Sequence, residues 1–424
     1  MKRLFLLFGT GCGVLFGQST RTLTVDEAVR EAIASNLDLA AARYDISVAE
    51  ARQITARLRP NPVMTLSADH LDLLGTGYNT TNNAGPNEYS YRTDFILERG
   101  GKRAARMELA SAAKSVAELR FRDAMRRLAF EVESGFVDVQ LAKENLALAT
   151  DNLRSLNGIV SVNTERVRTG DLAAVELNRS QVAAMQYQTA VRQAELQLRQ
   201  AKNQLRLLLG RPELLEDFDI SGPIRREERP VNLQEVRTHA FSQRPDLLEV
   251  RQTQARNQAD LRLQLAQGKI DYTAGAEYRR QQAPSGMGNS LGFFFSAPLP
   301  VFNRNQGEVA RAQQEIAQAA TQVRAIEARV NGEVTGAWQQ YSTSRELLED
   351  IEKRVLEKAG DVRQTTEYSY RRGEATLVEF LDAQRAFNEV TQSYNEARAN
   401  YARSLYLIDS VTAQSLAASP VPQP

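Results

Sequence analysis

Few side chains in this sequence could carry out chemistry, and two carboxylates near its C-terminal end stand out. Glu379 and Asp382 lie three residues apart in a segment that predicts a helix, so both fall on one face of it. Such a pair can attract cations, but it is also typical of an ordinary solvated helix face. The residues alone leave both interpretations open.

The other reactive side chains argue against an enzyme. The only cysteine is Cys12 and the only histidines are His70 and His239, which excludes a disulfide framework and disfavours a Cys/His metal site. No nucleophile and base can be paired, so we expect no catalytic, cofactor-binding or metal-ligating residues. The 53 Lys and Arg residues balance the 52 Asp and Glu residues, so no basic field indicates a nucleic-acid partner.

Residues 1–17 predict a signal peptide. Lys2 and Arg3 precede an apolar run from Leu4 to Phe16, which is too short to span a membrane as a helix. Lipidation at Cys12 is a disfavoured alternative, because Gly9 stands where a lipidation signal has a leucine-like residue.

The rest of the chain reads as one unit used twice. A shift of 208 positions (235 minus 27) places Glu235 on Glu27, and a shift of 203 (373 minus 170) places Gly373 on Gly170. The predicted organisation is a first repeat, a linker, a second repeat and a disordered tail: residues 18–210, 211–230, 231–410 and 411–424.

Two segments in each repeat alternate in the manner of β-strands. Tyr89, Tyr91 and Phe95 point to one face, whereas Arg92 and Asp94 point to the other. Such alternation over about ten residues is typical of strands that cross a membrane in a barrel, although a half-buried soluble sheet is the alternative. The predicted strands lie near residues 62–72, 88–98, 270–280 and 289–299.

Long helices follow each pair of strands. We predict them near residues 102–168 and 305–370, because proline is absent and glycine is rare in both segments. The helices that return carry seven-residue repeats, such as Leu177, Ala184 and Val191, which predict antiparallel coiled-coil packing. The helix before the first strands is predicted over residues 26–58.

This order of elements resembles the TolC-like outer-membrane efflux proteins over essentially the whole mature chain. The segment from Leu97 to Arg106 is similar to the entry into the first long helix of the cobalt–zinc–cadmium resistance branch. The segment from Pro298 to Gly307 is similar to that branch's entry into the second. Arg99 departs from the branch pattern, which has a leucine-like residue there.

The resemblance implies a mainly α fold with a small transmembrane β part. Three identical subunits would form an α-helical barrel across the periplasm and a twelve-stranded β-barrel in the outer membrane of a Gram-negative bacterium, with four strands from each subunit. The implied function is that of a passive exit duct in a tripartite RND-type efflux pump that exports heavy-metal cations. Its partners would be a periplasmic adaptor, an inner-membrane RND transporter and outer-membrane lipid.

The resemblance also assigns roles to individual residues. Glu379 and Asp382 match the acidic positions that ring the closed periplasmic entrance in this family. Six such carboxylates in a trimer would favour cations, and their crowding would let some hold protons. Ala375 stands where some relatives have an arginine that holds the entrance shut. The turns at the ends of the long helices would contact the adaptor, and their residues are Thr169, Gly170, Asp171, Leu172, Arg372, Gly373 and Glu374.

Three alternatives stay open at this point. The duct could carry drugs or other small molecules in place of metal ions. In another class, the chain could be a periplasmic adaptor or a structural coiled-coil protein. Two complete sets of strands and helical hairpins disfavour both of the latter.

Overall fold

The computed structural model describes residues 21–414, apart from residues 72, 74, 76–85, 212–217, 228–229 and 284–285. The predicted signal peptide, Cys12 and tail residues 415–424 therefore lie outside the described residues. The chain forms two compact units. Unit 1 comprises Met1–Asn36, Leu128–Glu228 and Ser342–Tyr406, and unit 2 comprises Leu37–Arg127, Arg229–Tyr341 and Leu407–Pro424. Each unit draws on both sequence repeats, so a repeat is not a compact unit by itself.

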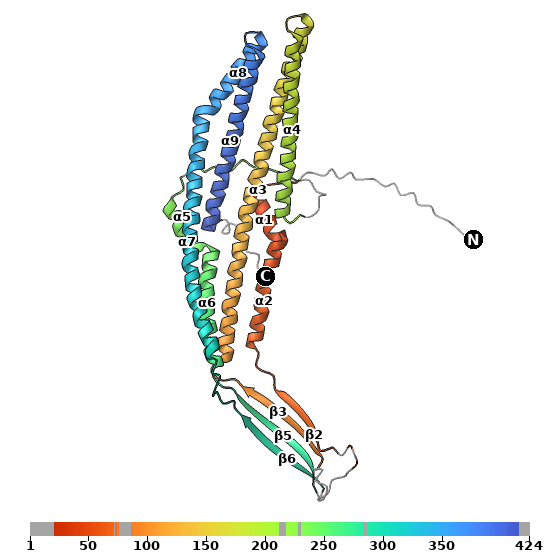
Figure 1. Ribbon diagram of the computed structural model, residues 1–424, viewed down its shortest axis with the longest axis vertical. Helices are drawn as coiled ribbons and strands as arrows, with labels where there is room; N and C mark the ends of the chain where they lie inside the picture. Colours follow the sequence, from red (N-terminus) through yellow and green to blue (C-terminus); the bar gives the residue numbers. More distant parts are fainter. Residues whose placement is uncertain are drawn as a thin grey trace, which may run out of the picture. The chain divides into compact units, whose positions relative to one another are not determined.

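Four antiparallel strands form one sheet in unit 2 (Figure 1). In spatial order they are β2 (Val63–Asp69), β3 (Glu88–Leu97), β5 (Tyr272–Ala283) and β6 (Gly286–Ser296).

The register of these strands separates two faces of the sheet. One row across the strands joins Leu66, Tyr91, Tyr278 and Leu291, and the adjacent row joins Thr65, Arg92, Glu277 and Gly292. Because side chains alternate along a strand, the sheet has an apolar face and a polar face.

The second hairpin differs from the predicted strand positions. β5 continues to Ala283, and β6 begins at Gly286, three residues before the predicted start at 289. Gly286 has a φ of 121°, a conformation that only glycine adopts readily, so the chain can turn there. β6 ends at Ser296 because Pro298 and Pro300 have no N–H to donate to a neighbouring strand.

The helix predicted over residues 26–58 is two helices, α1 (Val25–Ser35) and α2 (Leu37–Arg57). Asn36 interrupts them with an extended backbone, and its side-chain amide donates a hydrogen bond of 3.1 Å to the carbonyl of Leu208. The interruption therefore fastens the end of α1 to α4 (Ala174–Leu208) within unit 1.

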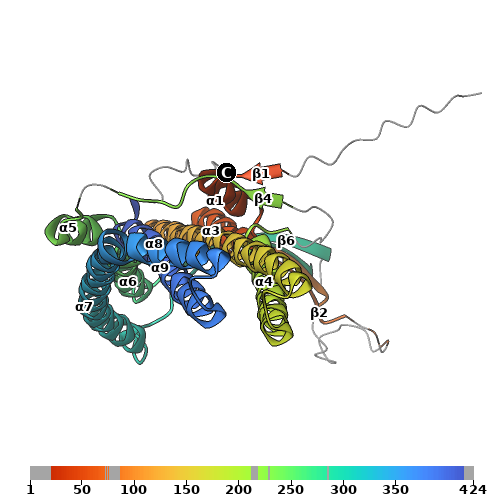
Figure 2. The same ribbon diagram turned by 90° about the horizontal axis from the view of Figure 1, so that it is seen from above.

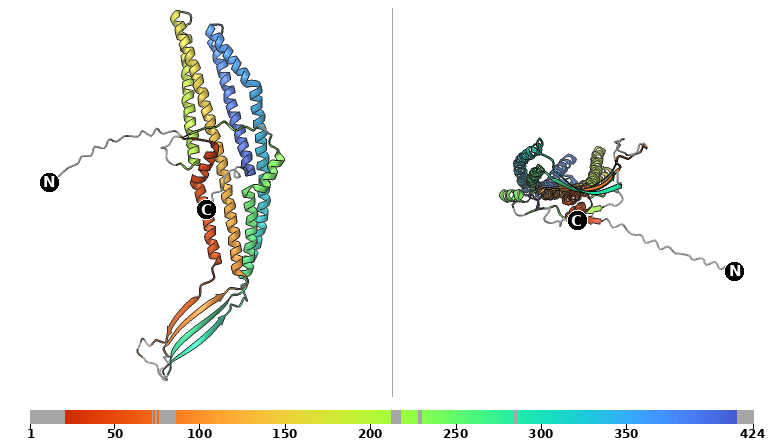
Figure 3. Two further views of the ribbon diagram at one scale, coloured as in Figure 1. Left: turned by 180° about the vertical axis from the view of Figure 1, so that it is seen from behind. Right: turned by 90° about the horizontal axis from the view of Figure 1, so that it is seen from below.

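Two other helical predictions need correction. α3 is continuous over Lys102–Thr169, but the second long helix is α7 (Gln306–Asp350), a π-turn η1 (Ile351–Val355) and α8 (Leu356–Arg372). The helix bends at this π-turn (Figure 3). α9 (Leu377–Thr412) extends two residues beyond the predicted end of the repeat at 410, because Val411 and Thr412 are buried.

A short parallel pair in unit 1 was not predicted. β1 (Arg21–Leu23) pairs with β4 (Phe218–Ile220), and α1 lies beside them (Figure 2). Leu23 and Phe218 are fully buried, so this pair closes a small apolar core. Among the described residues, the helices include none that combines the length and hydropathy needed to cross a membrane.

One buried arginine joins α6 (Pro245–Gln267) to α7 in unit 2. Arg244 lies between α5 (Leu233–Gln243) and α6 and is only 2% exposed. Its Nε and Nη2 donate to the Asp246 carboxylate at 3.0 and 2.6 Å, and its Nη1 lies 2.7 Å from Glu333 Oε2. Burial acts to raise the pKa of Asp246, but the Arg244 guanidinium outweighs it and holds that pKa below its ordinary value.

Replacing this arginine should destabilise unit 2. Arg244→Met leaves the Asp246 and Glu333 carboxylates without their buried partner, and we expect a loss of about 2–4 kcal/mol. Equilibrium urea unfolding of the purified protein, followed by far-UV circular dichroism, measures this loss. The control is Arg251→Met, which removes an exposed pair between the same two helices, Arg251 with Glu327, and should cost less than about 1 kcal/mol. Equal losses of unfolding free energy in the two variants would contradict a special stabilising role for the buried arginine.

Candidate functional site

The tip between α8 and α9 is a short turn built around Gly373. This glycine has a φ of 83° and ends α8, and its N–H donates to the carbonyl of Tyr370 at 3.0 Å. The next N–H, of Glu374, donates to the carbonyl of Ser369 at 2.9 Å. The paired bonds are the usual way in which a glycine in the left-handed region stops a helix.

Glu379 is part of the structure that starts α9. The N–H and the hydroxyl of Thr376 both donate to Glu379 Oε2, at 2.7 and 2.9 Å, and the Glu379 N–H donates back to the Thr376 hydroxyl at 3.3 Å. This reciprocal arrangement is a capping box. The bonds from the Thr376 backbone, and then from its hydroxyl, lower the pKa of the Glu379 carboxyl. In the single subunit, hydrogen bonding thus opposes the predicted uptake of protons at this residue.

Asp382 lies one turn further along α9 and points into solvent. Its side chain is 64% exposed, and its nearest charged partner is Arg385, with 3.5 Å between Asp382 Oδ1 and Arg385 Nη1. An exposed pair of this length holds the carboxylate weakly. The structure therefore places both predicted acids on the exposed first turns of α9, with Glu379 fixed by its own helix.

The tip of the first hairpin has the same backbone but different chemistry. Gly170 has a φ of 86°, and the N–H groups of Asp171 and Leu172 both donate to the carbonyl of Arg166. The shift of 203 places Ala173 on Thr376 and Arg179 on Asp382, so the capping hydroxyl and the second acid are absent here. Glu176, which aligns with Glu379, pairs instead with Arg179 at 2.8 Å. The acidic pair is a property of the second tip alone.

Behind the tips, an apolar cluster in unit 1 packs the two hairpins together. The ring of Tyr370 stacks on Phe380, with 5.7 Å between the ring centroids, and the Tyr370 hydroxyl donates to the buried Asn163 at 2.8 Å. Ala375, at the position of the expected arginine latch, packs against this cluster. The members of the cluster are Leu156, Ile159, Ala183, Ala184, Tyr370, Leu377 and Phe380.

A row of polar contacts continues from this cluster along α3 and α9. Asn152 and Gln384 meet at 2.9 Å, and Asn145 and Asn395 meet at 3.1 Å. Further from the tip, Glu144 accepts hydrogen bonds from Arg398 at 3.0 Å. Asn145 and Asn152 are one heptad apart, so these contacts follow one seam of the helix.

Sequence reasoning missed a clamp on the π-turn. Arg226, in the linker, donates to both carboxylate oxygens of Glu352 at 2.9 and 3.1 Å, and the Tyr394 hydroxyl donates to the same carboxylate at 3.2 Å. Nothing in the linker sequence signals a partner more than a hundred residues away. The clamp holds the helix at the point where its hydrogen bonding changes.

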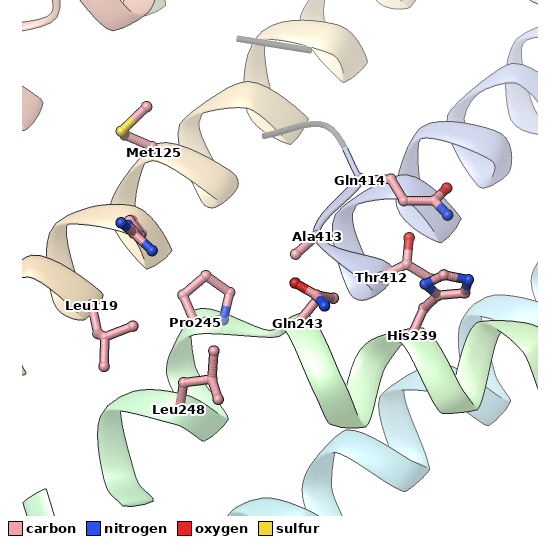
Figure 4. Close-up of a pocket in the computed structure, with 10 residues that line it drawn as sticks. Leu119, Met125, His239, Gln243, Pro245, Leu248, Thr412, Ala413 and Gln414 are labelled. Carbon is pink, nitrogen blue, oxygen red and sulfur yellow. The ribbon is translucent and has the colours of Figure 1, made fainter. Parts of the chain in front are cut away.

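A cavity of about 590 Å³ lies in unit 2, apart from every predicted site residue (Figure 4). Its walls include Leu119, Met125, Pro245, Leu248 and His239. Among the described residues, no three His, Cys, Asp or Glu side chains come close enough together to hold a metal ion.

Known proteins resemble this chain over most of its length. The cobalt-zinc-cadmium resistance protein CzcC of Cupriavidus metallidurans is 24% identical over 375 residues, which cover 88% of this chain and 85% of CzcC. A membrane protein from Pseudomonas aeruginosa superposes with a TM-score of 0.74 at 19% identity, covering 92% of this chain and 93% of that protein. CusC, whose structures concern folding and transmembrane channel formation, superposes with a TM-score of 0.73 at 18% identity, covering 92% of this chain and 91% of CusC.

These likenesses agree with the sequence pattern of the two repeats. The outer membrane efflux protein family matches residues 28–211 and 236–413, so it accounts for both repeats and for the two hairpin tips. This chain belongs to the outer membrane efflux protein family.

Proposed function

We propose that this protein is the passive outer-membrane exit duct of a tripartite efflux pump and that its cargo is heavy-metal cations. The observation that carries the proposal is the match of both repeats to the efflux family. The likeness to a cobalt-zinc-cadmium resistance protein supports the choice of cargo. The duct would stand in the outer membrane of a Gram-negative bacterium and extend into the periplasm.

A homotrimer would pair the strand edges and cover the apolar seam that a single subunit leaves exposed. β2 and β6 are the edges of the sheet, and open edges cannot persist in lipid, so three sheets joined edge to edge would form a closed barrel. Val175, Val182 and Leu196 form an exposed heptad seam on α4 that a neighbouring subunit would cover.

Within the trimer, Glu379 and Asp382 would face the axis and form a negative ring at the periplasmic entrance. Both carboxylates are exposed, and Glu379 has a lowered pKa, so both suit a wet ring that attracts cations. The two glycine turns would meet a periplasmic adaptor, which in turn binds an inner-membrane RND transporter.

Deletion of the gene tests the duct and its cargo together. The strain should become sensitive to divalent cobalt, zinc and cadmium and should regain resistance when the gene is supplied in trans. The protein extracted from outer membranes should migrate as a trimer on an unboiled gel and as a monomer after heating. If the deletion strain becomes sensitive to drugs but not to metal ions, the cargo is drugs. A monomer in the unboiled sample would contradict the proposed trimer.

Neutralising the acidic ring should weaken block by cations. The variant Glu379→Gln/Asp382→Asn removes both charges, and glutamine can still complete the capping box, so the helix start is retained. In planar bilayers, we expect lower cation selectivity and at least about a tenfold weaker block by added divalent cations. Trimer stability should be unchanged.

The matched control is Glu389→Gln/Glu396→Gln, which removes two exposed charges further along α9. Its selectivity and block should equal those of the parent. A pH series in the Asp382→Asn background then isolates Glu379. Because its pKa is lowered, the remaining block should persist below the ordinary glutamate pKa of about 4.3 and disappear only as the pH falls through the lowered value. Equal block in the ring variant and the parent would leave these acids as a solvated helix face.

Bulky side chains at the two turns should stop export without preventing assembly. Gly170→Leu/Gly373→Leu places apolar bulk where the adaptor is proposed to bind, and we expect metal resistance to fall to that of the deletion strain. The double alanine variant imposes the same left-handed strain, about 1–2 kcal/mol at each site, without the bulk. It should retain resistance. Full resistance in the leucine variant, with trimers present, would exclude the turns as the contact.

A further inference from the structure

The loop between β6 and α7 exposes three large apolar side chains in a run of four residues. Leu299 is 82% exposed, Val301 is 61% exposed and Phe302 is 91% exposed. The loop directly follows the exposed Phe293 and Phe295 of the sheet's apolar face. Large apolar groups gathered in this way usually mark a surface that contacts a partner or a membrane.

Hydrogen bonds fix this loop in its exposed conformation. The N–H of Val301 donates to the carbonyl of Leu299 at 2.9 Å, and Gln306 Nε2 donates to the carbonyl of Phe302 at 3.1 Å. The side-chain amide of Asn305 donates to the carbonyl of Gln264 at 2.8 Å, which ties the loop to the end of α6. These hydrogen bonds thus hold the backbone that carries the exposed apolar side chains.

Basic residues surround the same junction between the strands and the helices. Arg103 Nε donates to the Arg57 carbonyl at 2.7 Å. A side chain at Gly100 would clash with Lys269, and one at Gly268 would clash with the Arg304 carbonyl, so these segments lie close together. These contacts bring the helix ends together in unit 2. We call five of the exposed basic residues at the junction the basic rim: Arg57, Arg59, Arg103, Lys269 and Arg304.

The charge of this rim is not neutralised within the subunit. The acids of the junction already have partners, since Asp271 pairs with Lys102 at 2.7 Å and Glu98 pairs with Arg106. In the part of the chain that the structure describes, no carboxylate lies within ion-pair distance of any member of the basic rim. Apolar side chains next to unpaired cations suit a surface that is apolar on one side and anionic on the other.

We propose that this junction binds the phospholipid of the membrane leaflet into which the sheet inserts. Leu299, Val301 and Phe302 enter the acyl-chain region, and the basic rim contacts anionic headgroups. Large apolar side chains partition into the acyl-chain boundary, and cationic side chains are attracted to anionic lipid. The inference rests on the proposed insertion of the sheet into the outer membrane.

Site-directed spin labels can test the loop and the sheet separately. Single cysteines replace Phe302, Phe293 and Gln322 in a Cys12→Ser background, and each labelled full-length protein is reconstituted in phosphatidylcholine–phosphatidylglycerol vesicles. Phe293 reports on the sheet's apolar face, and Gln322 is an exposed position on α7. We expect labels at 293 and 302 to collide more with oxygen than with a water-soluble nickel chelate, and the label at 322 to show the reverse.

The possible results separate the two proposals. A label at 302 that favours the nickel chelate, while the label at 293 favours oxygen, overturns the lipid surface and leaves the inserted sheet intact. A label at 302 shielded from both reagents also overturns it, because a neighbouring subunit then covers the loop. Nickel accessibility at both 293 and 302 contradicts the proposed membrane location itself.

Lipid selectivity tests the basic rim. A fluorophore on Phe302→Cys is quenched by brominated phosphatidylglycerol or brominated phosphatidylcholine, which gives the relative affinity of the two lipids at the loop. We expect a several-fold preference for phosphatidylglycerol that decreases with salt, and at least about a twofold loss of preference in Arg57→Gln/Arg59→Gln. The control Arg324→Gln/Arg329→Gln removes two exposed charges on α7 and should keep the parent's preference. No preference in the parent would overturn the headgroup contact.

Discussion

The heptad faces of α3 and α9 would pack nearly as well after a shift by one repeat, and polar side chains along the seam prevent that shift. Apolar contacts between coiled-coil helices are similar at each heptad, whereas a buried amide is satisfied in only one register. Gln384 of α9 is fully buried, so a shift would separate its side-chain amide from Asn152 of α3. The contacts that fix the register of α3 against α9 are Asn152–Gln384, Asn145–Asn395 and Glu144–Arg398, and Asn163–Tyr370 joins α3 to α8.

Fixing this register also fixes the chemistry at the tips. The stacked pair of Tyr370 and Phe380 brackets the turn of the second hairpin, so the capping box of Thr376 and Glu379 starts at a set height on α9. The π-turn and its clamp through Glu352 lie at the other end of α8. The hairpin that carries the acidic pair is therefore anchored both at its turn and at the π-turn.

The fold was largely predictable because its main signals are periodic. Alternating aromatic residues such as Tyr89 and Tyr91 revealed the strands, and the family match confirms the resemblance that the repeats suggested. The features that were not predicted have specific causes. Three-residue strands such as β1 carry no alternation to detect, and the break at Asn36 depends on a hydrogen bond to Leu208 that no local pattern encodes.

The helical placement of the two acids was predictable from their spacing, but their bonding was not. The spacing of Glu379 and Asp382 predicted that both lie on one face of the helix. The hydrogen bonds from Thr376 that lower the pKa of Glu379 were not predicted from the sequence. The π-turn was missed because its stabilising partner, Arg226, comes from the linker. Contacts between distant segments depend on tertiary packing, which composition and periodicity do not specify.

We propose that Asp382 side chains from three subunits converge at a narrow entrance, and intersubunit cross-linking measures this convergence directly. In a Cys12→Ser background, Asp382→Cys places one cysteine per subunit on the exposed first turns of α9. Mild oxidation of the assembled protein should produce disulfide-linked dimers on a non-reducing gel, whereas Glu396→Cys should remain monomeric after denaturation. Intact trimers with no cross-link at position 382 would contradict the convergence of these acids.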